Sequence, residues 1–311
     1  MKKELLVWAV GLLTFGAVDA HPLCMDSSLS PSAHGNLVVQ KDFRYELVWG
    51  DEFNVNSPVN PRYWSFEKGF VRNFEPQWHQ EENAVCENGH LVITAKKERV
   101  RNPNYRKGDA FWSKNREYAE YTSSSLNTRN ECDLLYGRME IRAKIPVSSG
   151  AWPALWCKGY KTKNGAWPAC GEVDILEFYS KEILTNVAWS NEKGGSIWNT
   201  LKIPFTHFLE KDSLWAEEYH VWRMDWDEKS IRLYLDDELL NTTPLSKTVQ
   251  PVGDFCKVPN PFKTPMFLLL NLALRLSDGM DHSHFPLKYN IDYVRFYKFK
   301  DNPSSALRIH K

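Results

Sequence analysis

Apolar and polar residues alternate along several short stretches of the chain. In residues 138–145 every second side chain is apolar and the side chains between them are charged. An alternation with a period of two predicts a β-strand with one buried and one solvated face. Three more stretches show similar patterns: 91–95, 221–226 and 231–235. Because only four residues separate the last two stretches, these are expected to form a hairpin.

Residues 267–272 read FLLLNL, a nearly continuous apolar run that predicts a central strand. The longer periodicity that is typical of helices is absent. Short strands separated by polar turns predict an all-β fold, in which two antiparallel sheets pack face to face and enclose the core. No linker or internal repeat interrupts the strand-like segments, so a single domain is expected.

The two ends of the chain differ from its strand-rich middle. Residues 1–20 combine two lysines, an apolar run and small residues near a cleavage site, as a secretory signal does. The apolar run is too short to predict a membrane span, and no other segment approaches the length of one. We therefore expect a signal peptide over 1–20, a linker over 21–40, the folded domain over 41–300 and a polar tail over 301–311. The exported protein would be periplasmic, held at the cell surface or secreted, and Cys24 leaves lipoprotein anchoring open.

The charges of the chain balance, with 39 basic and 39 acidic residues and an isoelectric point near 7.1. This balance argues against nucleic acid or a membrane surface as a partner. The six cysteines show no Cys-x-x-Cys spacing, which argues against a zinc site. Disulfides and free buried thiols both stay open.

Residues 171–178 read GEVDILEF and place three carboxylates, Glu172, Asp174 and Glu177, in an otherwise apolar strand-like segment. We call these three residues the acidic trio. Successive side chains of a strand alternate between its faces, so Glu177 should point away from the other two acids. A β-bulge at Ile175 or Leu176 would absorb one residue and return Glu177 to their face. The three carboxylates would then converge.

Converging carboxylates suit the cleavage of a glycosidic bond. One acid must be protonated to donate to the leaving oxygen, and a second must be ionised to act at the anomeric carbon. The central acid can hold the second one in place and, by repulsion, keep a proton in the cluster. Two long side chains on an inward-curving strand favour the short carboxyl separation of a retaining enzyme, about 5–5.5 Å.

Motifs on both sides of the acidic trio extend this interpretation. The sequence resembles glycoside hydrolase family 16, specifically its laminarinase-like branch with the bulged Glu-x-Asp-x-x-Glu motif. The stretches that carry the resemblance lie within about residues 45–298: 47–54, 136–145, 150–156, 167–172 and 289–297. The resemblance implies a concanavalin A-like jelly-roll sandwich with a concave substrate cleft, and makes 41–300 the catalytic domain. It implies Glu172 as nucleophile, Asp174 as its assistant and Glu177 as general acid and base, with Trp152, Trp156 and Trp167 lining the cleft.

The chain holds 13 tryptophans and 13 tyrosines, more than core packing usually needs. Aromatic rings stack against the apolar face of a pyranose, so further tryptophans are candidates for sugar binding. These additional candidates are Trp78, Trp189 and Trp198. Asp292 resembles a position that supports a calcium ion in some family members. One carboxylate is weak evidence for an oxygen-rich calcium site, so no cofactor is required and a structural calcium ion stays open.

The chain departs from the laminarinase-like pattern in two places. Where many members have a Val-His pair, residues 187–190 read VAWS, and residues 274–284, LRLSDGMDHSH, replace a loop that is often rich in Gly and Asn. Both stretches are expected to border the cleft. Basic residues outnumber acidic ones in 96–116, which reads as a long loop. This loop is interpreted either as a solvated insertion or as a cleft wall that meets an anionic sugar.

The sequence therefore predicts an exported, monomeric, endo-acting and retaining glycoside hydrolase. By resemblance, the expected substrate is a β-1,3-glucan or a mixed β-1,3/1,4-glucan. The two departures motivate an alternative, an endo-β-galactosidase on host O-glycans or algal galactans. A hypothesis of another class is a non-catalytic lectin that binds carbohydrate on the same sandwich.

Overall fold

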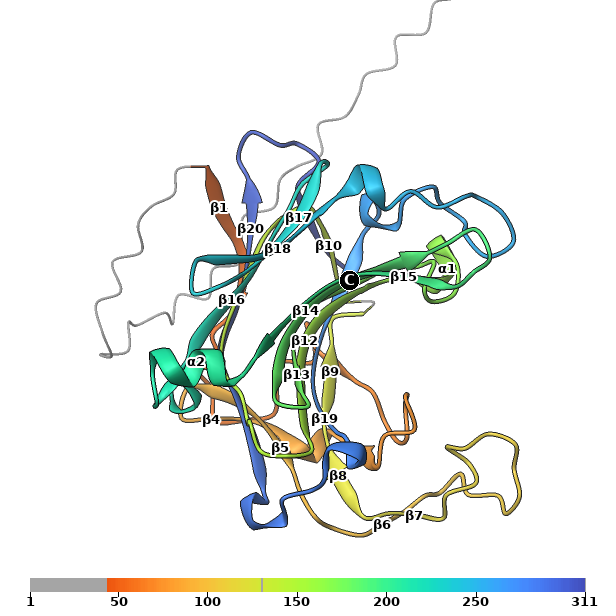
Figure 1. The fold of residues 1–311 in the computed structure, drawn as a ribbon, viewed down its shortest axis with the longest axis vertical. Helices are drawn as coiled ribbons and strands as arrows, with labels where there is room; N and C mark the ends of the chain where they lie inside the picture. Colours follow the sequence, from red (N-terminus) through yellow and green to blue (C-terminus); the bar gives the residue numbers. More distant parts are fainter. Residues whose placement is uncertain (1–43, 130, 311) are drawn as a thin grey trace, which may run out of the picture. The chain divides into compact units, whose positions relative to one another are not determined.

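The computed structural model describes residues 44–129 and 131–310, which form two stacked antiparallel sheets (Figure 1). The first sheet has eight strands: in spatial order β18 (Glu238–Pro244), β17 (Ser230–Leu235), β16 (His220–Trp226), β11 (Gly137–Lys144), β20 (Leu287–Phe299), β5 (His90–Ala95) and β4 (Ala84–Glu87), with β1 (Tyr45–Asp51) also paired to β20. The predicted hairpin is confirmed, because β16 and β17 pair along their length.

The second sheet has nine strands: in spatial order β15 (Ser196–Pro204), β14 (Glu182–Ser190), β13 (Glu172–Tyr179), β12 (Ala151–Gly159), β19 (Met266–Leu274), β10 (Cys132–Leu135) and β21 (Ala306–Ile309), with β9 (Ser125–Asn127) paired to β19 and β2 (Ser65–Phe66) paired to β9. In Figure 1, β12, β13 and β14 curve together, so this sheet presents a bent surface. The acidic strand β13 lies near its middle.

Shorter elements lie between the strands of the two sheets. They include two small strand pairs, β3 (Gln77–His79) with β8 (Tyr121–Ser123) and β6 (Val100–Arg101) with β7 (Tyr118–Ala119), the helices α1 (Lys161–Asn164) and α2 (Thr206–Lys211), and the 3-10 turns η1 (Glu81–Asn83), η2 (Trp215–Glu217), η3 (Leu245–Lys247), η4 (Pro261–Lys263), η5 (Leu276–Asp278) and η6 (His282–His284). In the described part of the chain, no helix is long and apolar enough to cross a membrane.

The core fills the space between the sheets. In β11, Met139 and Ile141 are buried while the charged residues between them are partly exposed, as the alternation predicted. β19 is buried along its whole length and lies between β12 and the short strands β9 and β10, which confirms the predicted central strand. Leu270 of β19 packs in the core, whereas Leu269 belongs to a separate apolar cluster with Trp156. One face of this strand therefore packs in the core between the sheets, and the other packs in the smaller cluster with Trp156.

The end of the chain corrects one prediction. Residues 301–311 were expected to be a polar tail, but β21 pairs with β10 from Cys132 opposite Ile309 to Leu135 opposite Ala306. The four residues of β21 are too few for their hydrophobic alternation to predict a strand. Their pairing depends on β10, which is distant in sequence. The described residues all lie in one compact unit, 42–311, whereas the predicted signal peptide and linker lie outside the described residues.

The cysteine question is settled for five of the six residues. Cys86, Cys132, Cys157, Cys170 and Cys256 are free and buried. Burial raises the pKa of the Cys157 thiol far above its usual value, and the negative charge of Asp174 adds to that effect. The Cys157 thiol is therefore held in its neutral form, as an apolar packing group.

Candidate active site

A β-bulge interrupts the strand that carries the acidic trio, at the place where the alternation of side chains between the two faces requires it. On β12, Leu155 pairs with Leu176. The next residue of β12, Trp156, pairs with Asp174, so Ile175 is left without a partner. Ile175 and Leu176 are both fully buried in the core. The prediction of a bulge is confirmed, and its consequence is that the whole acidic trio lines one cleft on the opposite face of the sheet.

The cleft has a volume of about 440 Å³ and crosses the middle strands of the bent sheet. Its floor comes from strands β12 to β15 and β19, and the segment before β3 adds one rim. Aromatic, cationic and amide side chains surround the carboxylates: Trp152, Trp156, Trp167, Tyr179, Trp198, Arg72, Lys158, Lys202, Arg275, Asn73, Asn186 and Asn271. This mixture can hold a polar ligand that also has apolar faces.

Glu177 carries a proton near neutral pH. Its pKa is raised to about 7, mainly by burial and in addition by the negative charge of Glu172. A hydrogen bond from Nε1 of Trp152 to Oε1 of Glu177, 2.9 Å long, works in the opposite direction because it favours the ionised form. The side-chain amide of Asn186 also donates to Glu177, at 2.7 Å. Glu177 is therefore held rigidly and is available as an acid.

Asp174 lies between the two glutamates and is 3% exposed. Burial raises its pKa well above the usual value, and the charges of Glu177 and Glu172 add to this effect. Nδ2 of Asn186 donates to Asp174 at 2.9 Å as well as to Glu177. The Asn186 amide thus bridges Asp174 and Glu177 and fixes the distance between their carboxyl groups.

Glu172 differs from its neighbours because two cations act on it. Burial raises its pKa, but the positive charges of Lys158 and Arg72 oppose that rise, and so does a hydrogen bond from the Trp167 indole. Lys158 is its cross-strand partner on β12. Of the acidic trio, Glu172 is the member whose ionised form has the most support.

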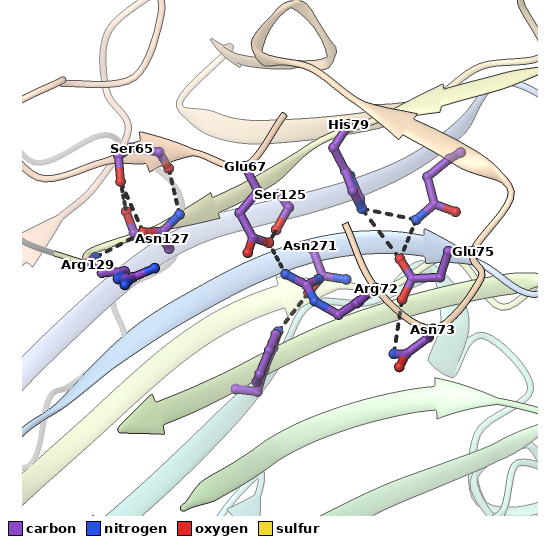
Figure 2. Close-up of polar contacts among 12 residues, drawn as sticks. Ser65, Glu67, Arg72, Asn73, Glu75, His79, Ser125, Asn127, Arg129 and Asn271 are labelled. Carbon is purple, nitrogen blue, oxygen red and sulfur yellow. Dashed lines mark hydrogen bonds and ion pairs between the residues drawn. The ribbon is translucent and has the colours of Figure 1, made fainter. Parts of the chain in front are cut away.

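Arg72 is fixed from behind by a second layer of polar contacts (Figure 2). Its guanidinium forms an ion pair with Glu67, whose carboxylate also accepts a hydrogen bond of 2.7 Å from Ser125. The same guanidinium lies 5.1 Å from the centre of the Trp156 ring. Trp156 in turn donates to Asn271 at 2.7 Å. The positive charge opposite Glu172 is thus held in one position.

The predicted tryptophans divide into two groups. Trp152, Trp156 and Trp167 line the cleft, and Trp198 joins Trp167 there with a ring separation of 6.1 Å. Trp167 and Trp198 are 44% and 43% exposed, so their faces are free. Trp152 and Trp156 instead use their indole nitrogens to position other side chains of the site.

Two tryptophan predictions are wrong. Trp189 is 6% exposed and lies in the core, because Asn186 and Ala188 of β14 pair with the acidic strand on the cleft side, and alternation turns Trp189 the other way. Trp78 does not line the cleft, since its ring packs edge-on against Phe70 at 5.5 Å. Applying the same alternation of side chains to the neighbouring strand would have excluded Trp189 from the cleft.

The residues around Asp292 do not fit a calcium site. Its carboxylate accepts a hydrogen bond of 2.5 Å from Arg142, and His90 lies 3.9 Å away. A guanidinium at this position already neutralises the charge that a calcium ion would need. Within residues 44–129 and 131–310, no three side chains of His, Cys, Asp or Glu come together to hold a metal.

Sequence reasoning missed several members of the site. Asn186 could have been found, because it lies opposite Asp174 once the bulged hairpin of β13 and β14 is paired. Arg72 gave no signal, since it precedes the acidic strand by a hundred residues and lies outside any strand. The expectation that 274–284 borders the cleft is confirmed for Arg275, whose guanidinium lies 4.6 Å from the Tyr179 ring and pairs with Asp278. In 187–190, Ala188 pairs with Glu172.

Comparison with known proteins agrees with this geometry. The family model described as glycosyl hydrolases family 16 matches residues 70–295. A β-glucanase from Rhodothermus marinus is 30% identical, with 82% of this chain and 86% of the relative covered. Among solved structures, the laminarinase catalytic domain of Thermotoga maritima aligns with a TM-score of 0.67 at 30% identity, covering 83% of this chain and 99% of that domain.

A second solved structure comes from work on endo-acting O-glycanases that prominent members of the human gut microbiota express to initiate mucin breakdown. It aligns with a TM-score of 0.74 at 31% identity, covering 85% of this chain and 97% of that one. The jelly-roll sandwich predicted from the sequence is confirmed by these neighbours and by the two observed sheets.

Replacing Trp152 by phenylalanine tests the electrostatics of the site. The change keeps an aromatic ring but removes the N–H that favours ionised Glu177, so the pKa of Glu177 should rise above its value of about 7. Titration of ¹³C-labelled glutamate carboxyls by NMR measures the shift. Trp156→Phe is the matched control, because the Trp156 indole donates to Asn271 and not to a carboxylate. A pKa that falls, or moves equally in both variants, would contradict this assignment.

Proposed function

Because the chain belongs to the glycosyl hydrolases of family 16 and is a glycosidase, we propose that it cleaves internal bonds of a β-1,3-glucan or mixed β-1,3/1,4-glucan with retention of configuration. The observation that carries the proposal is the unequal electrostatics of two glutamates on one strand. Glu177 holds a proton near pH 7, whereas cations and an indole N–H favour ionised Glu172. A retaining glycosidase needs this pair of states.

The reaction follows from those states. An oxygen of ionised Glu172 forms a bond to the anomeric carbon as the glycosidic C–O bond breaks, and Glu177 gives its proton to the leaving oxygen. Glu177 then accepts a proton from a water molecule, whose oxygen displaces Glu172 from the anomeric carbon. Because the first step requires protonated Glu177, activity should decline as the pH rises through about 7.

Asp174 and Asn186 organise this exchange. The Asn186 amide holds both Asp174 and Glu177, so the acid keeps its orientation while its charge changes. Asp174 lies within the same buried cluster, where repulsion between the acids opposes full ionisation. The cluster as a whole can therefore store one proton between the two chemical steps.

The cleft supports an endo-acting enzyme. Exposed rings of Trp167 and Trp198 lie on one side of the acidic trio, and the Arg72 rim lies on another, so a chain can extend beyond the reacting sugar. We also propose that the enzyme is exported, because residues 1–20 have the pattern of a secretory signal.

A second substrate class has an observation in its favour. The O-glycanase structure aligns with a TM-score of 0.74, compared with 0.67 for the laminarinase domain. Arg275 in the cleft and Ala188 beside Glu172 both belong to the segments that depart from the laminarinase-like pattern. An endo-β-galactosidase acting on O-glycans is therefore the alternative, with the same acidic trio and the same reaction.

Product release from laminarin, lichenan, agarose and mucin glycans decides between the two classes. The proposal expects oligosaccharides of mixed length from laminarin or lichenan, since internal bonds are cut. Products only from the galactose-containing glycans would replace the glucan assignment by the alternative. A protein that binds one of these glycans but releases nothing from it would support the lectin hypothesis.

Glutamine substitutions separate the two glutamate roles. Glu177→Gln should slow polysaccharide cleavage by roughly 10²–10⁴-fold, because no proton reaches the leaving oxygen. It should still release the phenolate from an activated aryl glycoside in a burst, since that leaving group needs no acid. Glu172→Gln should lose both activities, roughly 10³-fold or more, because no covalent intermediate can form.

Glu238→Gln is the matched control, because Glu238 is exposed on β18 of the other sheet, pairs with Lys211, and neither of these two residues lines the cleft. Its rates should equal those of the wild type. Equal effects of Glu172→Gln and Glu177→Gln on the aryl glycoside would contradict the division of roles.

A further inference from the structure

Four aromatic side chains form a row that reaches the surface beside the cleft. Trp78 contacts Phe70 at 5.5 Å, Phe70 contacts Trp112 at 5.7 Å, and Trp112 contacts Phe74 at 5.1 Å between ring centres. From Phe70 outward the exposure increases, from 8% for Phe70, through the partly buried Trp112, to 73% for Phe74. The outer end of the row is therefore an aromatic surface without cover in the described part of the chain.

This row is continuous with the rim of the cleft. Asn73 and Glu75, the neighbours of Phe74 in sequence, both line the cleft that contains the acidic trio. Arg116 joins the two features, because its guanidinium donates to the backbone carbonyl of Glu75 at 2.9 Å and lies 4.3 Å from the centre of the Phe70 ring. A ligand chain that leaves the cleft over this rim would meet the aromatic surface next.

The rim is fixed in place, as Figure 2 shows for Asn73, Glu75 and His79. The buried carboxylate of Glu75 accepts hydrogen bonds from Asn73 at 3.2 Å and from Gln77 at 2.7 Å. Gln77 also accepts from the backbone N–H of Leu274, which precedes Arg275 of the cleft. The position of Phe74 is thus tied to the central strand β19.

The loop between β6 and β7 brings Trp112 to this rim. Figure 1 shows the loop projecting from the sandwich. It is nevertheless ordered by its own contacts, because the side chain of Asn102 donates to the carbonyls of Ser113 and Arg116, both at 2.8 Å. The basic stretch 96–116 therefore places an aromatic side chain, Trp112, against Phe74 beside the rim of the cleft.

The backbone at Phe74 is consistent with a functional position. Asn73 and Phe74 have φ angles of 55° and 56°, in the left-handed region that non-glycine residues rarely adopt. Two such residues in succession are costly, and here they hold a phenyl ring in water. A conformation that keeps an apolar face exposed suits a ligand that covers it.

We propose that Phe74 and Trp112 form a platform that stacks against a distal sugar ring of the glycan whose reacting bond lies at the acidic trio. The proposal rests on the proposed function and adds a subsite to it. A pyranose presents an apolar C–H face to the rings and hydroxyls at its edge. Asn73 and Arg116 flank the rings and can bond to those hydroxyls. Continuity with the cleft identifies the occupant as the same substrate chain.

Binding as a function of oligosaccharide length tests the platform. The background is Glu177→Gln, which slows turnover, and calorimetry measures the binding of the probes, laminarin and mucin-glycan oligosaccharides of increasing length. Affinity should rise when the chain becomes long enough to reach the platform. Phe74→Ala and Trp112→Ala should each weaken the long probes about threefold to tenfold and leave the shortest binding probes unchanged.

Phe74→Tyr should preserve the affinity for long probes, because its ring still stacks. Leu239→Ala is the control for loss of an exposed apolar side chain, since Leu239 is 51% exposed on β18 of the other sheet. Melting temperatures confirm that each variant folds. Affinity for long probes that is unchanged in both alanine variants, or lost equally for short and long probes, would overturn the platform.

Hydrolysis of polysaccharide by the wild type tests the proposed reaction separately from the platform. Cleavage of a polysaccharide together with length-independent binding overturns only the platform. If no probe binds and no polysaccharide is cleaved, both proposals fail. Capture of a protein by the Phe74 and Trp112 surface, with no effect of their substitution on long oligosaccharides, would assign the surface to a partner instead.

Discussion

The bulge at Ile175 is the constraint on which the rest of the site depends. A regular strand would bury Glu177 in the core and bring an apolar side chain into the cleft. With one residue absorbed, Ile175 and Leu176 both remain in the core and the acidic trio faces a single cleft. The same local irregularity thus satisfies the packing between the two sheets and the chemistry on the outer face.

Once the acids converge, their environments make them different. Each member of the acidic trio has a pKa raised by burial, so burial alone cannot assign their roles. The distinction comes from the surroundings: two cations, Lys158 and Arg72, act on Glu172, whereas Glu177 has one, Arg275, and also feels the negative charge of Glu172. Arg72 in turn is held in position by Glu67, which accepts a hydrogen bond from Ser125. Residues far from the acidic strand in sequence therefore influence the charge state of Glu172.

Local patterns predicted the features whose cause is local. The strands at 138–145 and 267–272 and the position of the bulge followed from alternation within one segment. The errors arose where a second strand decides the outcome: Trp189 turns inward because of its pairing with the acidic strand, and β21 exists because β10 accepts it. The rim at Asn73 and Glu75 could not be predicted, because an irregular segment is placed there by contacts with Arg116 and β19.

The most direct test of the central claim is the identity of the residue that becomes covalently attached to the sugar. A glycoside with fluorine at C2 and an activated leaving group slows the breakdown of a glycosyl-enzyme, so the intermediate accumulates for peptide mass spectrometry. The account predicts one added sugar, located on Glu172 in the peptide that contains residues 171–178. A sugar attached to Asp174 or Glu177, or turnover of the reagent with no attached sugar, would contradict it.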